Sequence, residues 1–233
     1  MFYNTNRHPK ETDPIDNSIL ETRGSLYRTV QELGFIDIEK FINFINRGIV
    51  LNLGSGGGGL GVDFEVLKRL RGVDLGTIYS INPRHGSHTE EQLKYFYNLD
   101  PFKRYFKEDL KDLSEDELEE IHSQANEVNK THTTNDSWEK LSFPDEFFDK
   151  IISTGSYIFY PRTFTESSFL EIYRVLKHGG EMRIGLAGFT PNTKQIDEII
   201  EKIKELNLDI ELNLIKEKDI HNLDVLCLQV IKK

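Results

Sequence analysis

Residues 49–61 read IVLNLGSGGGGLG, a short apolar run that changes abruptly into six glycines within eight positions. A continuous apolar run is typical of a parallel strand that is buried on both faces. Glycines directly after such a strand leave no Cβ atoms at the place where the backbone approaches a bound molecule closely. The stretch therefore predicts a buried strand followed by a ligand-binding loop.

The glycine spacing is typical of loops that bind nucleotides. The pattern G-x-G-x-x-G begins once at Gly54 and a second time at Gly56. In a dinucleotide-binding loop the ligand lies at the N-terminus of the next helix, and an acid about 20 residues further on holds the ribose. Apolar residues between 63 and 71 recur at helical spacing, so we expect that helix there.

Apolar periodicity predicts an alternation of helices and strands along the rest of the chain. A strand, a helix and a second strand in succession form a parallel pair with a right-handed crossover. We expect strands at 49–53, 77–83, 150–154, 181–187, 208–214 and 225–231. The last two strands are too close in sequence for a helical crossover, so they should be antiparallel and the sheet mixed.

Helices are expected between these strands. Ser114 and Glu117 fit a capping box inside an acidic helical region at 90–129, and Thr163 and Glu166 fit a second one. Gly179 and the glycine after it should end that second helix. The other expected helices lie at 35–45, 63–71 and around 196–203.

Length, charge and cysteine content predict one soluble domain. The 233 residues fit a single α/β domain at 24–233, preceded by an arm at 1–23 and carrying the acidic helical insertion at about 90–130. A net charge of −10 disfavours nucleic acid as a partner. Cys227 is the only cysteine, and neither a signal peptide nor a membrane-length apolar stretch occurs, so we expect a cytoplasmic protein without a membrane partner. The scattered histidines predict no metal site.

Three blocks resemble the class I S-adenosylmethionine-dependent methyltransferases. They are residues 50–58 (VLNLGSGGG), 136–149 (DSWEKLSFPDEFFD) and 171–180 (EIYRVLKHGG). The likeness covers roughly residues 35–231. It implies an α/β, Rossmann-like fold with a seven-stranded mixed sheet, helices on both faces and an antiparallel last strand.

The resemblance also implies S-adenosylmethionine as the cofactor and assigns its contacts. The methionine part would lie against the glycine loop, the ribose at the end of the second strand, the adenine at the start of the second block, and the sulfonium above the end of the strand at 150–154. Gly54, Ser55 and Gly56 would contact the methionine part, and Ser80, Ile81 and Asn82 would contact the ribose. Asp136, Ser137 and Trp138 would contact the adenine, and Thr154 and Gly155 would lie near the sulfonium.

Two positions depart from the family pattern. Asn52 stands where an acid usually helps to hold the ammonium group of the cofactor, and Ser80 stands where an acid usually binds both ribose hydroxyls. Charge-assisted hydrogen bonds contribute about 1.5 to 3 kcal/mol, against about 1 kcal/mol for neutral ones. If the second strand aligns two residues later, Asn82 is the ribose contact instead.

The resemblance implies a methyltransferase, and we expect a small-molecule acceptor. The segment after the strand at 150–154 reads GSYI, which is unlike the tetrapeptide of enzymes that methylate base amino groups. Methyl transfer depends mainly on alignment of the reacting groups, so a dedicated base is not required. The candidates for a base or for a pocket wall are His85, His88, Tyr157 and Tyr160.

Two other functions remain open. A methyltransferase-like module that has lost its acids would bind a protein partner through the acidic helices at 100–130. An NADP-dependent reductase would explain Arg84 after the second strand and the spacing of Tyr173 and Lys177, although the third block accounts for the last two residues as well.

Overall fold

The computed structural model describes residues 26–35, 37–54, 59–72, 76–82, 102–103, 106–154, 164–186, 193–218 and 224–233. Within these ranges the chain forms one seven-stranded sheet with the strand order β3-β2-β1-β4-β5-β7-β6. The strands are β1 (Ile49–Leu53), β2 (Thr77–Ile81), β3 (Thr133–Thr134), β4 (Phe148–Thr154), β5 (Leu176–Gly185), β6 (Ile210–Lys218) and β7 (Asp224–Lys232).

Strand directions confirm the predicted mixed sheet. β1 to β5 run parallel to one another, whereas β7 is antiparallel to both β5 and β6. In the register of β1 and β2, Asn52 lies opposite Ser80, and Ser80 in turn lies opposite Thr133 of β3. The carboxyl ends of β1, β2, β3 and β4 therefore share one edge of the sheet, which is where α/β folds of this type bind ligands.

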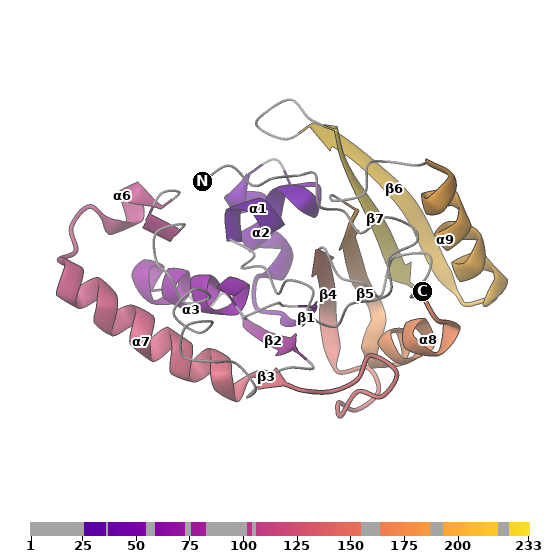
Figure 1. Ribbon diagram of the computed structural model, residues 1–233, viewed down its shortest axis with the longest axis horizontal. Helices are drawn as coiled ribbons and strands as arrows, with labels where there is room; N and C mark the ends of the chain where they lie inside the picture. The colour runs from indigo at the N-terminus through magenta and orange to yellow at the C-terminus, as the bar shows by residue number, and fades with distance from the viewer. Residues whose placement is uncertain are drawn as a thin grey trace, which may run out of the picture.

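Helices cover both faces of the sheet, each over its own apolar core (Figure 1). One face carries α1 (Leu26–Glu32), α2 (Ile38–Ile45), α3 (Gly59–Arg71) and α7 (Glu115–Thr131). The other face carries α8 (Glu166–Val175) and α9 (Thr193–Glu205), and the short α6 (Lys107–Leu110) precedes α7. The largest fully buried side chains lie in both layers, among them Phe41 and Phe64 under the first and Phe148 and Phe169 under the second.

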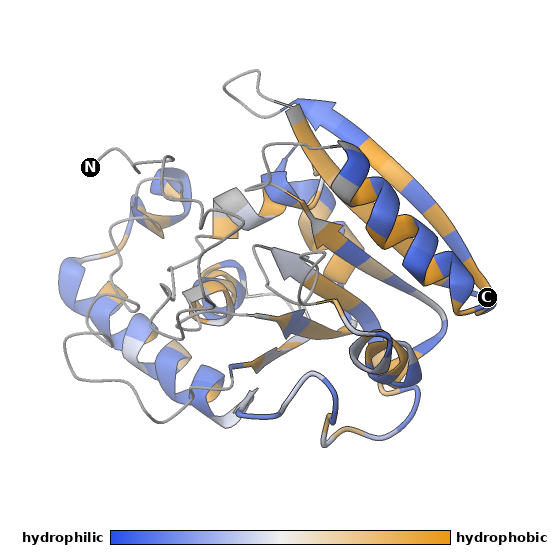
Figure 2. Cartoon of the chain, turned by 45° about the vertical axis from the view of Figure 1, so that its right-hand side comes forward, coloured by the Kyte–Doolittle hydropathy of each residue, from blue (hydrophilic) through white to orange (hydrophobic). Residues whose placement is uncertain are grey.

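The C-terminal elements follow the predicted patterns. Ile196, Ile199 and Ile203 are buried on α9, and Figure 2 shows α9 with alternating hydrophobic and hydrophilic bands beside β6. β6 is the edge strand, and from Ile210 to Leu214 its residues alternate between half-buried and exposed, as in an antiparallel strand with one solvated face. Of the helices in the ranges given above, none is long and apolar enough to cross a membrane.

Several local features differ from the expectations. β3 was not predicted, because two residues are too few to produce a periodic pattern. The helix expected to open at Thr163 begins at Glu166 and is capped by Thr165, whose hydroxyl accepts a hydrogen bond from the Ser168 N–H. The helix ends at Val175 rather than at Gly179, which lies inside β5. β4 begins two residues earlier than expected, at Phe148.

The capping box at α7 is confirmed. The Ser114 hydroxyl accepts a hydrogen bond from the Glu117 N–H, and the Glu117 carboxylate accepts one from the Ser114 N–H. These two bonds satisfy backbone donors that the helix itself leaves without a partner. Three acidic residues in the first turn also interact favourably with the positive end of the helix dipole.

Candidate functional site

The carboxyl edge of the sheet brings together four of the predicted segments. Gly54 follows β1 with a φ of 71°, a left-handed conformation that glycine adopts without the strain that a Cβ would add. Asn82 follows β2, and its N–H donates to the Thr134 carbonyl at the end of β3. Thr154 ends β4 and is half-buried. The edge therefore assembles residues that are far apart in the sequence.

Asn52 and Ser80 lie below this edge, inside the protein. Their side chains are 3% and 0% exposed, and they stand on the face of the sheet that α3 and α7 cover. Neither Asn52 Nδ2 nor Ser80 Oγ has a hydrogen-bond partner among the described residues. A buried polar group without a partner costs about 1 to 3 kcal/mol, so the position is one where the fold gives up stability.

Ile81 and Asn82 occupy the end of β2 itself. Ile81 is fully buried and points into the core layer under α8 and α9. Asn82 is 5% exposed and directly follows the last residue of the strand, two positions beyond Ser80. Of the two alternatives for the ribose contact, Asn82 is therefore the one at the edge, and Ser80 is the one covered by helices.

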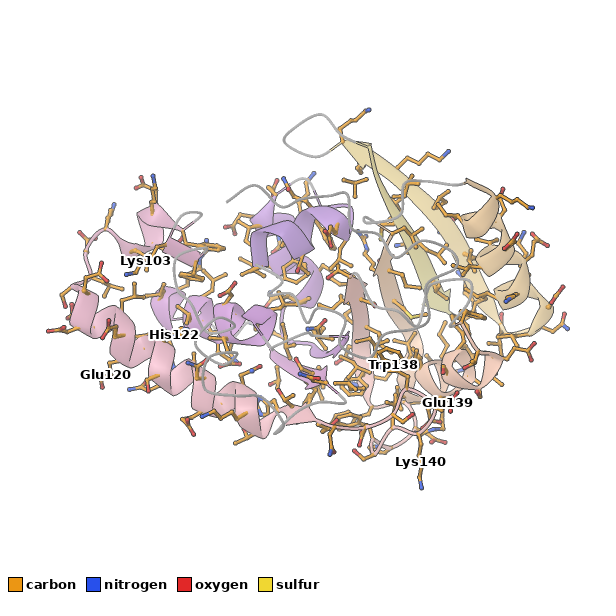
Figure 3. The ribbon with its side chains drawn as sticks, viewed as in Figure 1. Lys103, Glu120, His122, Trp138, Glu139 and Lys140 are labelled. Atoms are coloured by element: carbon orange, nitrogen blue, oxygen red, sulfur yellow. The ribbon has the colours of Figure 1, made fainter. Side chains whose placement is uncertain are left out.

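The segment from Asp136 to Trp138 begins the loop that joins β3 to β4. The Asp136 carboxylate accepts hydrogen bonds from the N–H and the hydroxyl of Ser142, at 2.8 and 2.7 Å. The Ser137 hydroxyl accepts one from the Glu139 N–H. Trp138 is half-buried against the core under α8, and its Nε1 has no partner in the described part of the chain. Figure 3 shows Trp138 on the inner side of the loop and Lys140 pointing outward.

Arg174 holds this loop in place from α8. Its guanidinium donates to both oxygens of Glu171, to Asp145, and to the carbonyls of Leu141 and Phe143. Glu171 in turn accepts from the Leu141 N–H at 2.7 Å. The hydrogen bonds from Arg174 are the main reason that the pKa of Glu171 lies below its ordinary value, and the two carboxylates raise the pKa of Arg174.

The second and third blocks of the sequence are therefore joined physically. The sequence predicted that both belong to one family pattern, but it did not show that Arg174 of the third block binds the loop of the second. A signal was available, since Glu171 and Arg174 are spaced i, i+3 and lie on the same side of a helix.

Asp149, the last residue of the second block, fixes the opposite end of the strands. It accepts hydrogen bonds from the Ile49 N–H at the start of β1 and from Lys177 in β5. Burial opposes its ionisation, but these two bonds more than offset that effect, and the pKa of Asp149 lies below its ordinary value. This carboxylate therefore ties three neighbouring strands together.

One buried polar residue near the edge was not predicted. Asn129, in the last turn of α7, is 3% exposed, and its Oδ1 has no hydrogen-bond partner within the described ranges. Leu118, His122, Ala125 and Asn129 are buried at helical spacing. That spacing was visible in the sequence and could have placed Asn129 on the buried face of the helix.

Several predicted site residues lie outside the described residues. They are the loop residues Ser55 and Gly56, the residue Gly155 after β4, and the four acceptor-side candidates His85, His88, Tyr157 and Tyr160. The predicted arm at 1–23 is also outside them. Within the ranges that are described, no group of three or more histidine, cysteine, aspartate or glutamate side chains could hold a metal ion.

A family model described as "Methyltransferase domain" matches residues 103–180, which contain both the loop from Asp136 and the helix that carries Arg174. This part of the chain is therefore similar to a methyltransferase domain. The seven-stranded mixed sheet with its antiparallel last strand β7 is the one that the resemblance to class I enzymes implied. S-adenosylmethionine is the cofactor expected for a domain of this kind.

Solved structures with similar folds carry related descriptions. A candidate S-adenosyl-L-methionine-dependent methyltransferase from Methanococcus maripaludis is 19% identical, covers 89% of this chain and 87% of its own, and has a TM-score of 0.49. A SAM-dependent methyltransferase from Aquifex aeolicus is 14% identical over 94% of both chains, with a TM-score of 0.46. No curated protein matches the sequence.

The residues at the edge fit a small polar cofactor. Asn52 Nδ2 is a donor and Ser80 Oγ can donate or accept, and both are buried without partners in the described part just below the strand ends. Gly54 leaves the turn above them free of a side chain. Neither Asn52 nor Ser80 supplies a negative charge, so hydrogen bonds from these two residues to a cofactor would be neutral.

Proposed function

We propose that this methyltransferase transfers the methyl group of S-adenosylmethionine to a small-molecule acceptor. The observation that supports the activity most directly is the carboxyl edge, where Gly54, Asn82, Asp136 and Thr154 meet above buried polar atoms that the fold leaves without partners. The cofactor supplies an activated methyl group, and the task of the protein is to bind it and to align an acceptor with it.

Within this proposal each segment of the edge binds one part of the cofactor. Gly54, Ser55 and Gly56 would hold the methionine part, and Asp136 with Ser137 would hold the adenine. Asn82 would bind the ribose hydroxyls, because it stands at the end of β2 whereas Ser80 lies beneath the α3–α7 layer. A side-chain amide can donate to one hydroxyl and accept from another, so Asn82 provides both kinds of hydrogen bond.

The charge of the chain supports a small acceptor over nucleic acid. A net charge of −10 repels a polyphosphate backbone, whereas it does not oppose a neutral or cationic small molecule. His85, His88, Tyr157 and Tyr160 follow β2 and β4 in the sequence, so they remain the proposed acceptor-side residues.

Calorimetric titration separates this function from its rivals. Under the proposal, S-adenosylmethionine and its demethylated product bind with micromolar or tighter affinity, and NADPH produces no heat. Binding of NADPH alone would favour the reductase, and no response to any of the three would favour a binding module. Either of those results would overturn the proposed activity.

The site assignment is tested with Asp136→Ala, which we expect to weaken S-adenosylmethionine binding at least about tenfold through loss of a charge-assisted hydrogen bond. Ser142→Ala is the matched control, because it removes the hydroxyl that donates to Asp136 and leaves the carboxylate in place. The control should bind within about threefold of the wild type, since it loses only one neutral donor. Equal affinities of Asp136→Ala and the wild type would refute the adenine assignment.

A further inference from the structure

The first turn of α3 approaches the last turn of α7 unusually closely at Gly61. A Cβ atom built on Gly61 would lie 2.0 Å from Asn129 Oδ1 and 3.0 Å from Asn129 Cγ. The next nearest atom is Ser80 Oγ at 3.7 Å, an ordinary van der Waals distance. Only glycine fits at position 61 while Asn129 stands opposite, and every atom in the way belongs to the Asn129 side chain.

Asn129 is held firmly on its own side of this contact. Asn129 is 3% exposed, and its backbone carbonyl accepts hydrogen bonds from the Thr133 hydroxyl at 2.7 Å and from the His132 N–H at 3.1 Å. Thr133 begins β3 and lies opposite Ser80 of β2. The end of α7 is therefore attached to the sheet next to the strand whose end is proposed to bind ribose.

Gly61 belongs to the part of α3 that follows the glycine loop directly. α3 begins at Gly59, and two residues beyond Gly61 the Asp63 carboxylate accepts a hydrogen bond from the Leu26 N–H of α1. The first turns of α3 are thus set between α7 on one side and α1 on the other. A shift of this helix end would move the loop that precedes it.

The contact also costs stability. Asn129 Oδ1 and Ser80 Oγ are both buried without hydrogen-bond partners in the described ranges, and both face the Cβ position of Gly61. An apolar side chain at 129 would avoid the unsatisfied oxygen, so the asparagine does not serve stability alone. A buried group without a partner therefore calls for an explanation other than packing.

We infer that Asn129 is a positioning residue for cofactor binding, which acts by setting the first turn of α3 and with it the glycine loop. The inference rests on the proposed function of the site. It assigns a role to the acidic helix α7, which the sequence suggested only as an insertion or a partner surface. The role is carried by the buried face of α7 and not by its exposed acids.

A double-mutant cycle tests the contact, with S-adenosylmethionine affinity measured by calorimetry. Gly61→Ala should weaken binding at least about thirtyfold, because its methyl group pushes α3 off Asn129. Asn129→Ala should weaken binding about tenfold, because the helix end loses its support. In Gly61→Ala/Asn129→Ala the colliding atoms are gone, so binding should recover to within about threefold of the Asn129→Ala single variant.

Ala125→Gly is the control for a merely structural effect. It lies one turn before Asn129 on the same buried face of α7 and destabilises the helix without removing the side chain opposite Gly61. Affinity should stay within about twofold of the wild type even where its melting temperature falls as far as that of Asn129→Ala. If Gly61→Ala does not fold, the comparison of Asn129→Ala with Ala125→Gly decides by itself.

The outcomes separate this inference from the proposed function. A wild-type protein that fails to bind S-adenosylmethionine overturns both. A wild type that binds, together with an Asn129→Ala variant of equal affinity or a double variant that binds no better than Gly61→Ala, overturns only the positioning role.

Discussion

Two polar regions of this molecule are built in opposite ways. Around Arg174 the charged groups are partly exposed and each has partners, since Glu171, Asp145 and two backbone carbonyls receive its five donors. Around Ser80 the polar groups of Asn52, Ser80 and Asn129 are neutral and almost fully buried, yet one atom of each has no partner among the described residues. The first arrangement fixes a loop, whereas the second costs stability.

The difference indicates where the chain depends on a ligand. A paired charge network reaches its full set of hydrogen bonds in the folded protein alone, so a ligand adds nothing to it. A neutral, unpaired cluster beneath a ligand edge still lacks bonds after folding. The arginine region should therefore control stability, and the cluster region should control cofactor affinity.

The largest expected effect on stability belongs to Arg174→Ala. The change leaves Glu171 and two backbone carbonyls without their donor, so we expect a loss of about 3 kcal/mol in the free energy of unfolding, measured with urea. Arg174→Lys is the control. It keeps the charge but not the planar fork, and should recover less than about half of the loss. A loss below about 0.5 kcal/mol for Arg174→Ala would contradict the claim that the region around Arg174 controls stability.

Asn52→Asp should have the next largest effect. The new carboxylate would be buried without a partner, which raises its pKa and costs about 2 kcal/mol at pH 8. Between pH 4 and the raised pKa the folded state would bind more protons than the unfolded state, so stability should fall as pH rises. Asn52→Leu is the matched control, and should keep full stability while it weakens cofactor binding. If the stability of Asn52→Asp did not change with pH, the side chain at position 52 would not be buried without a partner.

Acid titration should show a smaller effect, limited to the paired region. The pKa values of Glu171 and Asp149 lie below their ordinary values in the folded state. Their contribution to stability is therefore complete above about pH 4.5 and is lost as pH falls through the lowered pKa values. After allowance for solvent screening, each contributes about 1 kcal/mol. Urea unfolding between pH 6 and pH 3 should be less pH-dependent in Glu171→Gln.

The smallest effect should come from Lys204→Ala on α9. Glu201 and Lys204 have the same i, i+3 spacing as Glu171 and Arg174, but their side chains are 65% and 59% exposed. An exposed pair of this kind contributes less than about 0.5 kcal/mol. Equal losses for Lys204→Ala and Arg174→Ala in the same urea assay would show that spacing, and not burial and the number of partners, determines the effect.

Much of the fold was predictable because periodicity is a local property. The glycine run after β1, the alternation along β6 and the short connection before β7 were enough to predict a mixed sheet. β3 was missed because Thr133 and Thr134 become a strand only through pairing with β2. The start of α8 was misplaced because the capping hydroxyl comes from Thr165.

The site was predictable only as a set of segments. Resemblance assigned Asn52, Ser80 and Asn82 to one ligand, but it did not show which of them ends a strand and which is covered by helices. The contact of Gly61 with Asn129 gave no local signal, because its two residues lie on different helices. Spacing within α7 indicated a buried face, but not its neighbour.

The sequence by itself determined the order of elements, the glycine turn after β1 and the absence of charge at positions 52 and 80, because these depend only on which residues follow one another. The tertiary structure alone decided that Arg174 holds the loop after Asp136 and that Asn129 closes the space beside Gly61. Both are contacts between segments that only packing of helices on the sheet brings together, so no sequence period records them.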